Sequence, residues 1–114
     1  MHSILIVEDD FDLLDALGDM LEVEGYATKR AQNGSEALDL LRIPPRPAIV
    51  LLDLNMPIMN GWQFLAQKRN DPALVKVPVV AMSGANTERP QGAAGLLRKP
   101  ISAPALLSMV ERYC

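Results

Sequence analysis

Residues 3–10, SILIVEDD, decide the fold that we expect for this chain. The run from residue 3 to residue 7 is apolar, and it stops abruptly at three acidic residues. Such a run, without polar alternation, predicts a strand that is buried on both faces, as in a parallel sheet. Apolar residues then recur at helical spacing over residues 13–21, and Gly25 is placed to end that helix. The chain is therefore predicted to begin with a strand followed by a helix.

The same alternation continues along the rest of the chain. Further strands are predicted at residues 26–30, 48–52, 77–82 and 95–98, and further helices around residues 37–41, 62–69 and 106–113. A proline-rich stretch ends the second helix, and Pro104 suits the first turn of the last one. Strands that alternate with helices predict parallel βαβ units with right-handed crossovers. We expect a doubly wound α/β sheet in a single domain, residues 1–114.

Composition and charge exclude several classes of protein. The chain has 114 residues and a net charge of −3, with scattered basic residues, which argues against direct binding of nucleic acid. Its first apolar run is too short for a signal peptide or a membrane span. One cysteine, Cys114, cannot form an internal disulfide, and no cluster of cysteine and histidine indicates zinc. We expect a cytoplasmic protein that contacts neither nucleic acid nor membrane.

Acidic residues follow two of the apolar strands. Glu8 and Asp9 come after the first strand, and Asp53 comes after the strand at residues 48–52. In an open α/β sheet the ligand site lies beyond the carboxyl ends of the strands, so these carboxylates converge if the two strands are neighbours. Converging carboxylates either raise a pKa or bind a hard cation, and Mg²⁺ fits best.

Two further polar residues end the remaining strands of the predicted sheet. Ser83 supplies a neutral donor, and Lys99 supplies a point charge suited to phosphate. Taken singly, each of these residues has an ordinary explanation, such as a helix-dipole partner, a turn former, a cap or a solvated lysine. Their coincidence at four strand ends favours a functional site.

Four motifs resemble those of the receiver domain of two-component response regulators. They are IVEDD (6–10), LLDLNMPIMNG (51–61), AMSGA (81–85) and LLRKP (96–100), in the order and approximate spacing of that family. The resemblance covers essentially the whole chain. It implies a flavodoxin-like (βα)5 fold with strand order 2-1-3-4-5, which places the first and third strands side by side.

The resemblance also implies a role for each site residue. Asp53 matches the phosphoacceptor aspartate, and Glu8 and Asp9 match the acidic pair that holds Mg²⁺ with it. Asn55 matches the position whose backbone carbonyl also binds the ion. Ser83 matches the hydroxyl that hydrogen-bonds the acyl phosphate, and Lys99 matches the lysine that pairs with it. Such a domain catalyses only its own phosphorylation and dephosphorylation, so we do not expect an enzyme.

Partner contacts are likewise implied by the resemblance. The phosphoryl donor is a histidine kinase or a histidine phosphotransferase, and the downstream protein is unknown. Phe11, Pro100 and Ile101 lie where family members meet the histidine-bearing partner, although Phe11 and Ile101 could equally be partial core. The peptide bond between Lys99 and Pro100 is cis in the family, and we expect the same here.

The stretch SGANTERPQGAAGLLRKP, residues 83–100, departs from the family pattern. Receivers carry a full fourth helix in this crossover, whereas here few residues separate Ser83 from the final strand, and Pro90 disfavours a regular helix. We expect that helix to be absent or reduced to a turn, which either uncovers apolar sheet surface or leaves a shorter loop to cover it. The family's aromatic switch position is Leu96, so the usual coupling of that position to Ser83 is in doubt.

Two other functions remain open from the sequence. A receiver-like module that binds its partner independently of phosphate is favoured by Leu96 and by the short crossover, and disfavoured by the complete acid, hydroxyl and lysine set. A Mg²⁺-dependent phosphohydrolase with an aspartyl-phosphate intermediate would need a second acid for acid/base chemistry, and Asn55 occupies that position.

Overall fold

The computed structural model describes residues 3–84 and 87–114, which form alternating strands and helices. The strands are β1 (Ser3–Val7), β2 (Ala27–Ala31), β3 (Ile49–Asp53), β4 (Val79–Ser83) and β5 (Gly95–Arg98). The helices within the described ranges are α1 (Phe11–Val23), α2 (Gly34–Leu41), α3 (Gly61–Arg69) and α4 (Ala103–Glu111). The helix labelled α4 follows β5, so it occupies the place of a fifth helix in a (βα)5 arrangement.

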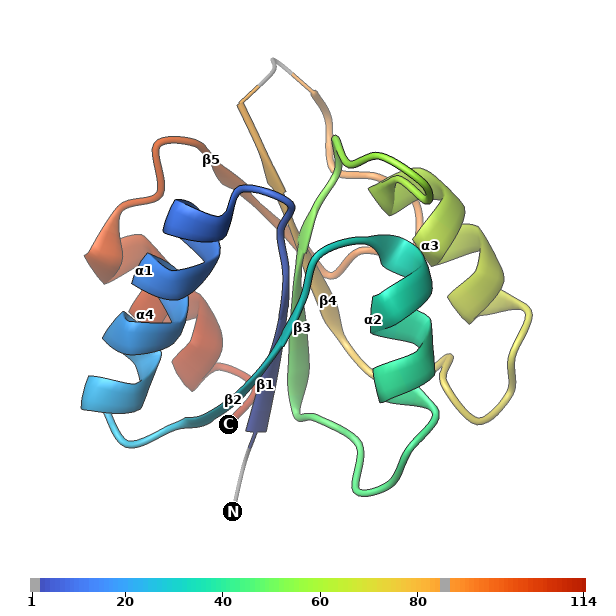
Figure 1. Ribbon diagram of the computed structural model, residues 1–114, viewed down its shortest axis with the longest axis horizontal. Helices are drawn as coiled ribbons and strands as arrows, with labels where there is room; N and C mark the ends of the chain where they lie inside the picture. The colour runs from blue at the N-terminus through green and yellow to red at the C-terminus, as the bar shows by residue number, and fades with distance from the viewer. Residues whose placement is uncertain (1–2, 85–86) are drawn as a thin grey trace.

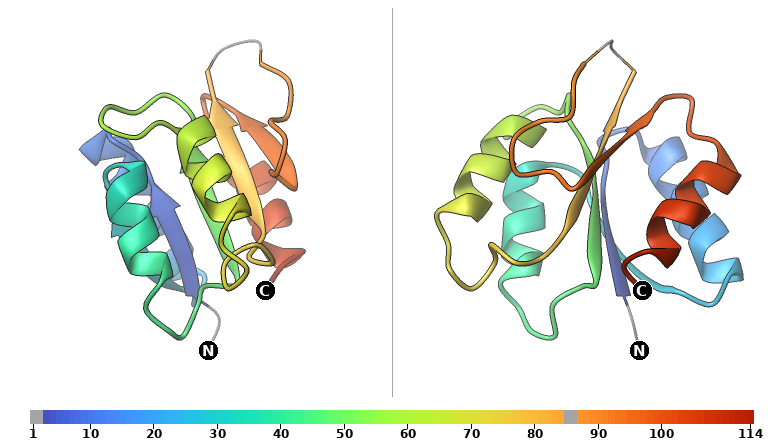
Figure 2. Two further views of the ribbon diagram at one scale, coloured as in Figure 1. Left: turned by 90° about the vertical axis from the view of Figure 1, so that its right-hand side faces the viewer. Right: turned by 180° about the vertical axis from the view of Figure 1, so that it is seen from behind.

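All five strands form one parallel sheet in the order β2-β1-β3-β4-β5. Helices α1 and α4 cover one face, and α2 and α3 cover the other (Figures 1 and 2). The predicted flavodoxin-like topology is therefore confirmed. Strand order reverses between β1 and β3, so their carboxyl ends lie at the point where doubly wound sheets bind ligands.

The central strands are apolar except for a polar residue at one end, because both of their faces are covered. Ile4 and Ile6 point into the core shared with α1 and α4, whereas Leu5 and Val7 point into the core shared with α2 and α3. All five residues of β3 are buried, as are all five of β4. The continuous apolar runs in the sequence reflect this two-sided burial.

Several predicted boundaries were wrong by one or two residues. The structure places β2 at Ala27–Ala31 rather than at residues 26–30, and β3 at Ile49–Asp53 rather than at 48–52. The fourth strand begins at Val79, because Pro78 has no N–H to donate to the ladder. The last helix begins at Ala103, with Ser102 as its N-cap and Pro104 in its first turn as expected.

A short segment, residues 84–94, connects β4 to β5. Its described part, residues 87–94, contains no helix, and the expectation for residues 85 and 86 lies outside the described residues. Pro90 and Ala93 are buried, and the Ala93 side chain joins the core on the α2 and α3 side. Residues 90 and 93 thus help to cover this part of the sheet. Residues 87–94 run beside β4 and β5 in Figure 2.

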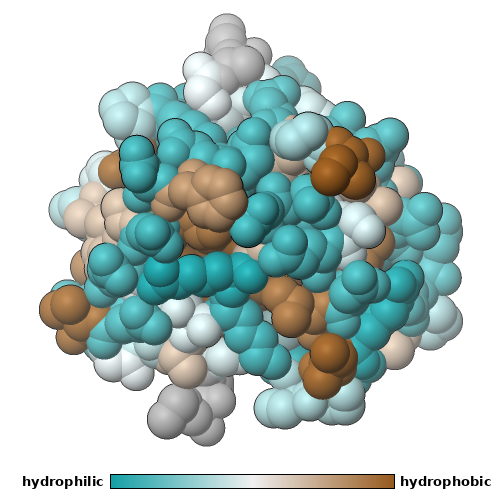
Figure 3. All heavy atoms as spheres, in the orientation of Figure 1, coloured by the Kyte–Doolittle hydropathy of each residue, from teal (hydrophilic) through white to brown (hydrophobic). Residues whose placement is uncertain are grey.

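The described surface is mostly hydrophilic. Large apolar side chains that are exposed, such as Phe11, Ile43 and Ile58, come from different elements. Figure 3 shows apolar residues in separate small patches on the face it presents. Within the described residues, no helix combines the length and apolar character that crossing a membrane requires.

Candidate functional site

Glu8 and Asp9 follow β1 directly, but they lie in different environments. The Glu8 backbone N–H donates to Ala31 O of β2 at 3.0 Å, which extends the ladder and keeps this residue at the edge of the sheet. The Glu8 side chain is only 1% exposed, whereas Asp9 is exposed. The next residue, Asp10, is the N-cap of α1 and accepts from the backbone N–H groups of Asp12 and Leu13. The acidic triplet therefore combines a buried carboxyl, an exposed carboxyl and a helix cap.

Asp53 ends β3 and is 3% exposed. Its Oδ1 accepts a long hydrogen bond from the Asn55 backbone N–H at 3.4 Å. The Leu54 N–H donates to Met82 O of β4 at 3.2 Å, so the chain stays fixed to the sheet just beyond the aspartate. Asn55 itself is exposed, beside Asp53.

Lys99 connects the two acidic positions. The Lys99 backbone N–H donates to Ser83 O at 2.9 Å, which places this residue immediately beyond the last pair of β4 and β5. Its Nζ lies 2.8 Å from Glu8 Oε1 and 3.3 Å from Asp53 Oδ1. Ser83 is fully buried at the end of β4. The structure thus brings together the five predicted site residues, Glu8, Asp9, Asp53, Ser83 and Lys99, which we call the strand-end site.

Burial dominates the electrostatics of this site. Burial raises the pKa of Glu8 to about 7, helped by the charge of Asp53 and partly offset by the contact with Lys99. Burial likewise raises the pKa of Asp53, against the lowering influence of Lys99 and of the Asn55 N–H. Burial alone would lower the pKa of Lys99, but the two carboxylates outweigh it and raise that pKa. The free-energy cost of burying the two carboxylates is therefore only partly offset by the contacts within the site.

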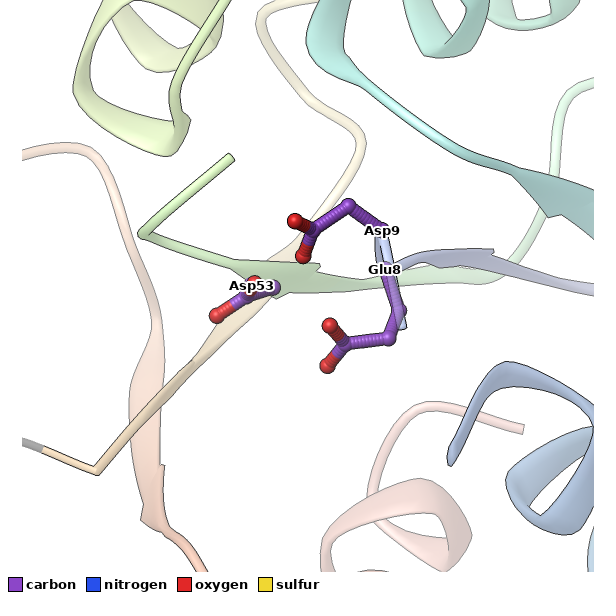
Figure 4. Close-up of side chains that lie close together, drawn as sticks. All are labelled: Glu8, Asp9 and Asp53. Atoms are coloured by element: carbon purple, nitrogen blue, oxygen red, sulfur yellow. The ribbon is translucent and has the colours of Figure 1, made fainter. Parts of the chain in front are cut away.

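The donor set fits a hard divalent cation. One carboxylate oxygen from each of Glu8, Asp9 and Asp53 lies within 4.8 Å of the others. Figure 4 shows the three side chains gathered at the ends of β1 and β3. Glu8 Oε1 is buried, and its close polar contact among the described residues is the Lys99 ammonium at 2.8 Å. Oxygen ligands of this kind, with water completing the shell, are those that Mg²⁺ takes.

The predicted partner-contact residues lie near the strand-end site in sequence but differ in exposure. Phe11 is 58% exposed at the start of α1, which excludes a core role for it in this chain. Pro100 is exposed and follows a cis peptide bond from Lys99, as expected. Ile101 is half-buried and packs against the core on the α1 and α4 side. Leu96 is half-buried and packs against the opposite core.

Sequence reasoning missed one polar residue beside the site. The Ser83 hydroxyl donates to Thr87 Oγ1 at 3.5 Å, and the Thr87 carbonyl accepts from Arg98 Nη2 at 3.1 Å. Position 87 lies in an aperiodic stretch, so no spacing rule points to it. The available signal was its closeness in sequence to Ser83, since threonine hydroxyls often bond to polar groups a few residues away.

Comparisons with known proteins agree with this fold and site. The profile of the response regulator receiver domain matches residues 4–111. The chain is 32% identical over 117 aligned positions to the polar-differentiation response regulator DivK of Brucella anthropi, covering 97% of this chain and 94% of that protein. This chain therefore belongs to the family of response regulator receiver domains.

Solved structures of the family superimpose closely on it. The receiver domain of a DNA-binding response regulator from Colwellia psychrerythraea has a TM-score of 0.86 and 32% identity, with 98% of this chain and 97% of that chain covered. The chemotaxis response regulator CheY4 of Vibrio cholerae has a TM-score of 0.88 and 27% identity, with 100% and 99% covered. Receiver domains accept phosphoryl groups from histidine kinases in two-component signalling, and the acidic triad typical of their Mg²⁺ site is present here.

Proposed function

We propose that residues 1–114 act as a single receiver domain in which Asp53 accepts the phosphoryl group. The observation that carries this proposal is the meeting of Glu8, Asp9, Asp53 and Lys99 at one edge of the sheet. The ends of three strands, β1, β3 and β5, fix these four residues, rather than a loose loop. A preorganised charged site of this kind suits phosphoryl transfer, in which positioning and electrostatics contribute most of the catalysis.

In the proposed reaction, an Asp53 carboxylate oxygen attacks the phosphorus of a phosphohistidine or a small phosphodonor. The new O–P bond forms as the bond from phosphorus to the imidazole nitrogen breaks, and that nitrogen keeps the electron pair. Asp53 Oδ1 lies against Lys99 Nζ, so the ammonium can move from the carboxylate to the arriving phosphoryl oxygens. The Ser83 hydroxyl at the adjacent strand end is placed to donate to the same group.

The carboxylates of Glu8, Asp9 and Asp53, with the Asn55 backbone carbonyl, would hold the Mg²⁺. When bound, the ion neutralises negative charge on the phosphoryl group during transfer. Within the chain, Lys99 already balances part of the negative charge of Glu8 and Asp53. Asp9 is the exposed member of the triad, so it is accessible to a cation from solvent.

The proposed phosphodonor is a histidine kinase or a histidine phosphotransferase, which this chain would meet in the cytoplasm. Phe11, Pro100 and Ile101 are the proposed contacts with it. The 58% exposure of the Phe11 ring and the exposure of Pro100 support this role, because both side chains are available to a partner. The half-buried Ile101 offers a smaller contact.

The output side of the protein is proposed to differ from the usual family pattern. In this proposal the segment 84–94 replaces the family's fourth helix, and an unknown downstream protein meets the resulting face. The helix-free course of residues 87–94 supports this view. So does Leu96, which has no polar atom with which to follow a movement of Ser83.

The first test is the intact mass of the protein after incubation with acetyl phosphate and Mg²⁺. We expect an adduct of one phosphoryl group that is lost in Asp53→Asn and in the presence of a chelator. Asp39→Asn is the matched control, because Asp39 is an exposed aspartate on α2 with only a distant ion pair to Arg42. An adduct of equal yield in Asp53→Asn would contradict the assignment of the acceptor.

The absence of any adduct would favour the second candidate, a docking module independent of phosphate. The altered connection between β4 and β5 and the leucine at position 96 are the features that favour this candidate. The phosphohydrolase alternative is not favoured, because Asn55 stands where the required second acid would be, and an amide cannot act as a general acid or base near neutral pH.

A further inference from the structure

Lys68 is a buried lysine that takes no part in the strand-end site. It lies near the end of α3 and is 4% exposed, although lysine side chains are almost never buried without a partner. Its Nζ donates to the Val75 carbonyl at 3.1 Å. Val75 belongs to residues 70–78, the yellow segment that follows α3 in Figure 1, which we call the α3–β4 connection. Lys68 therefore joins α3 to the middle of this connection.

In the part of the chain that the structure describes, no carboxylate pairs with the Lys68 ammonium. Asp71, the nearest acid in the sequence, accepts from the Ala73 N–H at 3.0 Å and lies 3.9 Å from Arg42 Nε. Burial lowers the pKa of Lys68, and no charged group among the described residues contributes to this shift. The other charged residues of α3 and of the elements around it are Arg69, Glu36, Asp39, Arg42, Asp71, Lys76, Glu88 and Arg89. The bond to the Val75 carbonyl thus offsets only part of the cost of burying the ammonium.

The α3–β4 connection contains several hydrogen bonds within itself. The N–H groups of Leu74 and Val75 both donate to Asp71 O at 3.0 Å, and the Val77 N–H donates to Leu74 O at 3.1 Å. These bonds would persist if the connection moved as a unit. Leu74 and Val77 are buried and pack into the core on the α2 and α3 side. The closed connection therefore gains apolar burial, but it keeps Lys68 away from water.

We propose that Lys68 makes the α3–β4 connection a pH-sensitive opening element, which opens locally while Lys68 is charged and closes more tightly when Lys68 loses its proton. Opening gives the ammonium water as a partner, whereas the closed form favours the neutral amine. The movement brings Leu74 and Val77 toward solvent at the amino end of β4. The strand-end site lies at the opposite, carboxyl end of the same strand, so this inference does not depend on the phosphorylation of Asp53.

The direction of the pH dependence follows from the two forms. The pKa of Lys68 is lowered in the closed form, and hydration in the open form restores its ordinary value of 10.5. As the pH rises toward 10.5, the closed form loses its proton first, so opening becomes less favourable. The unfolded chain behaves like the open form, so the contribution of Lys68 to the free energy of unfolding rises over the same range. Burial raises the pKa values of Tyr26 and Cys114, which also titrate at alkaline pH, but their effect cancels when a Lys68 variant is compared with the wild type.

The test uses Lys68→Met, which keeps an unbranched side chain of similar length but carries no charge. The matched control is Lys76→Met, because Lys76 is an exposed lysine on the same connection. Hydrogen exchange of the amides of Leu74, Val75 and Val77 is measured at pH 7 in the wild type and in both variants. The urea midpoint of each protein is measured at pH 7 and at pH 10.

We expect Lys68→Met to slow exchange of these three amides about fivefold or more at pH 7, because opening no longer hydrates a buried charge. Amides of the central strands should slow less, since the effect is local. The urea midpoint of Lys68→Met should rise relative to the wild type between pH 10 and pH 7, because the wild type carries the buried charge only at the lower pH. Lys76→Met should match the wild type in exchange and at both pH values.

The comparison at two pH values separates charge from packing. A packing defect in Lys68→Met would shift its urea midpoint equally at pH 7 and pH 10, whereas the proposal requires the difference from the wild type to change with pH. A difference that stays constant would overturn the inference. Exchange that slows equally across the central strands and the α3–β4 connection would also overturn it, because Lys68 would then act on global unfolding and not on local opening.

Discussion

Lys99 sets the charge balance of the strand-end site at the scale of single residues. Its ammonium contacts Glu8 Oε1 at 2.8 Å and Asp53 Oδ1 at 3.3 Å, yet burial still raises the pKa of both acids. One cation thus does not fully compensate two buried carboxylates. In the metal-free protein, the incompletely compensated burial of these carboxylates therefore lowers the free energy of unfolding.

The stability of the metal-free protein should consequently fall as the pH rises from about 4.5 to 7. In this window Glu8, with a pKa of about 7 in the folded protein and an ordinary value of 4.5, binds more protons in the folded than in the unfolded state. Rising pH therefore favours the unfolded chain. We expect a loss of about 1–3 kcal/mol in the free energy of unfolding, measured by urea titration in a chelating buffer.

The variant Glu8→Gln should reduce this pH dependence to the part that Asp53 contributes through its own raised pKa, whereas Glu111→Gln, at an exposed position on α4, should preserve it in full. Lys99 does not interfere with this measurement, because its raised pKa acts only near and above its ordinary value of 10.5. A stability that increases steadily between pH 4.5 and 7 would contradict the assignment to Glu8.

The sequence indicated which residues gather at the strand-end site but not their individual environments. Glu8, Asp53 and Ser83 lie at the carboxyl ends of three apolar strands. Because these strands are parallel neighbours, the three residues lie close together. Nothing in the pattern distinguished the buried Glu8 from the exposed Asp9, because both are acids at adjacent positions. Thr87 was not predicted as a neighbour of the site, because its contact with Ser83 depends on the course of an aperiodic segment.

At the scale of elements, the loop between β3 and α3 is packed against the start of α2. Gly34 N–H donates to Met59 O at 3.0 Å, and Gly61 N–H donates to Leu54 O at 3.0 Å. Within this loop Ile58 has a φ of 71°, which a β-branched residue rarely adopts. The loop that follows Asp53 is thus held in a constrained path by its neighbours.

Gly34→Ala should destabilise the protein by about 1–3 kcal/mol. A Cβ at position 34 would lie 2.8 Å from the Met59 carbonyl oxygen and 2.8 Å from Met59 Cγ, so the loop would have to move. The contact with the Met59 carbonyl oxygen cannot be relieved by turning a flexible side-chain end, because this atom belongs to the backbone. The expected result is a lower urea midpoint with an unchanged slope.

Gly84→Ala is the matched control for this substitution. Among the residues that the structure describes, a Cβ at position 84 would meet Lys99 Cβ, at 3.8 Å, which is an ordinary van der Waals distance. We expect stability close to that of the wild type. Equal losses in the two variants would show that crowding against Met59 is not the cause.

Strand boundaries were predictable from the sequence to within two residues. The apolar runs located β1, β3 and β4 to within two residues. The edge strand β2, with the sequence ATKRA, has a mostly half-buried pattern and was placed one residue too early. Its Arg30 lies across Gly18 of α1 and pairs with Asp15, Asp19 and Glu22, a packing that helical spacing alone does not predict.

At the scale of the whole molecule, the carboxyl edge of the sheet carries an excess of negative charge that Mg²⁺ should relieve. A ligand that binds only the folded state stabilises it, by about 1.4 kcal/mol at ten times its Kd and about 2.7 kcal/mol at a hundred times. We therefore expect the Tm to rise steadily with Mg²⁺ concentration, measured by calorimetry at pH 7.5.

This rise in Tm should be much smaller in Asp53→Asn and in Glu8→Gln, each of which removes a carboxylate of the triad. Asp39→Asn, on the exposed side of α2, should retain the full effect. A similar rise in all four proteins would mean that Mg²⁺ acts through general screening and not through the strand-end site.

The helix-free course of residues 87–94 also bears on how the chain folds. The connections through α1, α2 and α3 contain helices, which form locally within about a microsecond and shorten the search for the next strand. Between β4 and β5 the chain must instead close a loop. The conformational entropy lost in closing this loop is offset only when Pro90 and Ala93 become buried. We therefore expect β1, β2 and β3 to assemble first and β5 with α4 to join last, as a C-terminal cooperative unit.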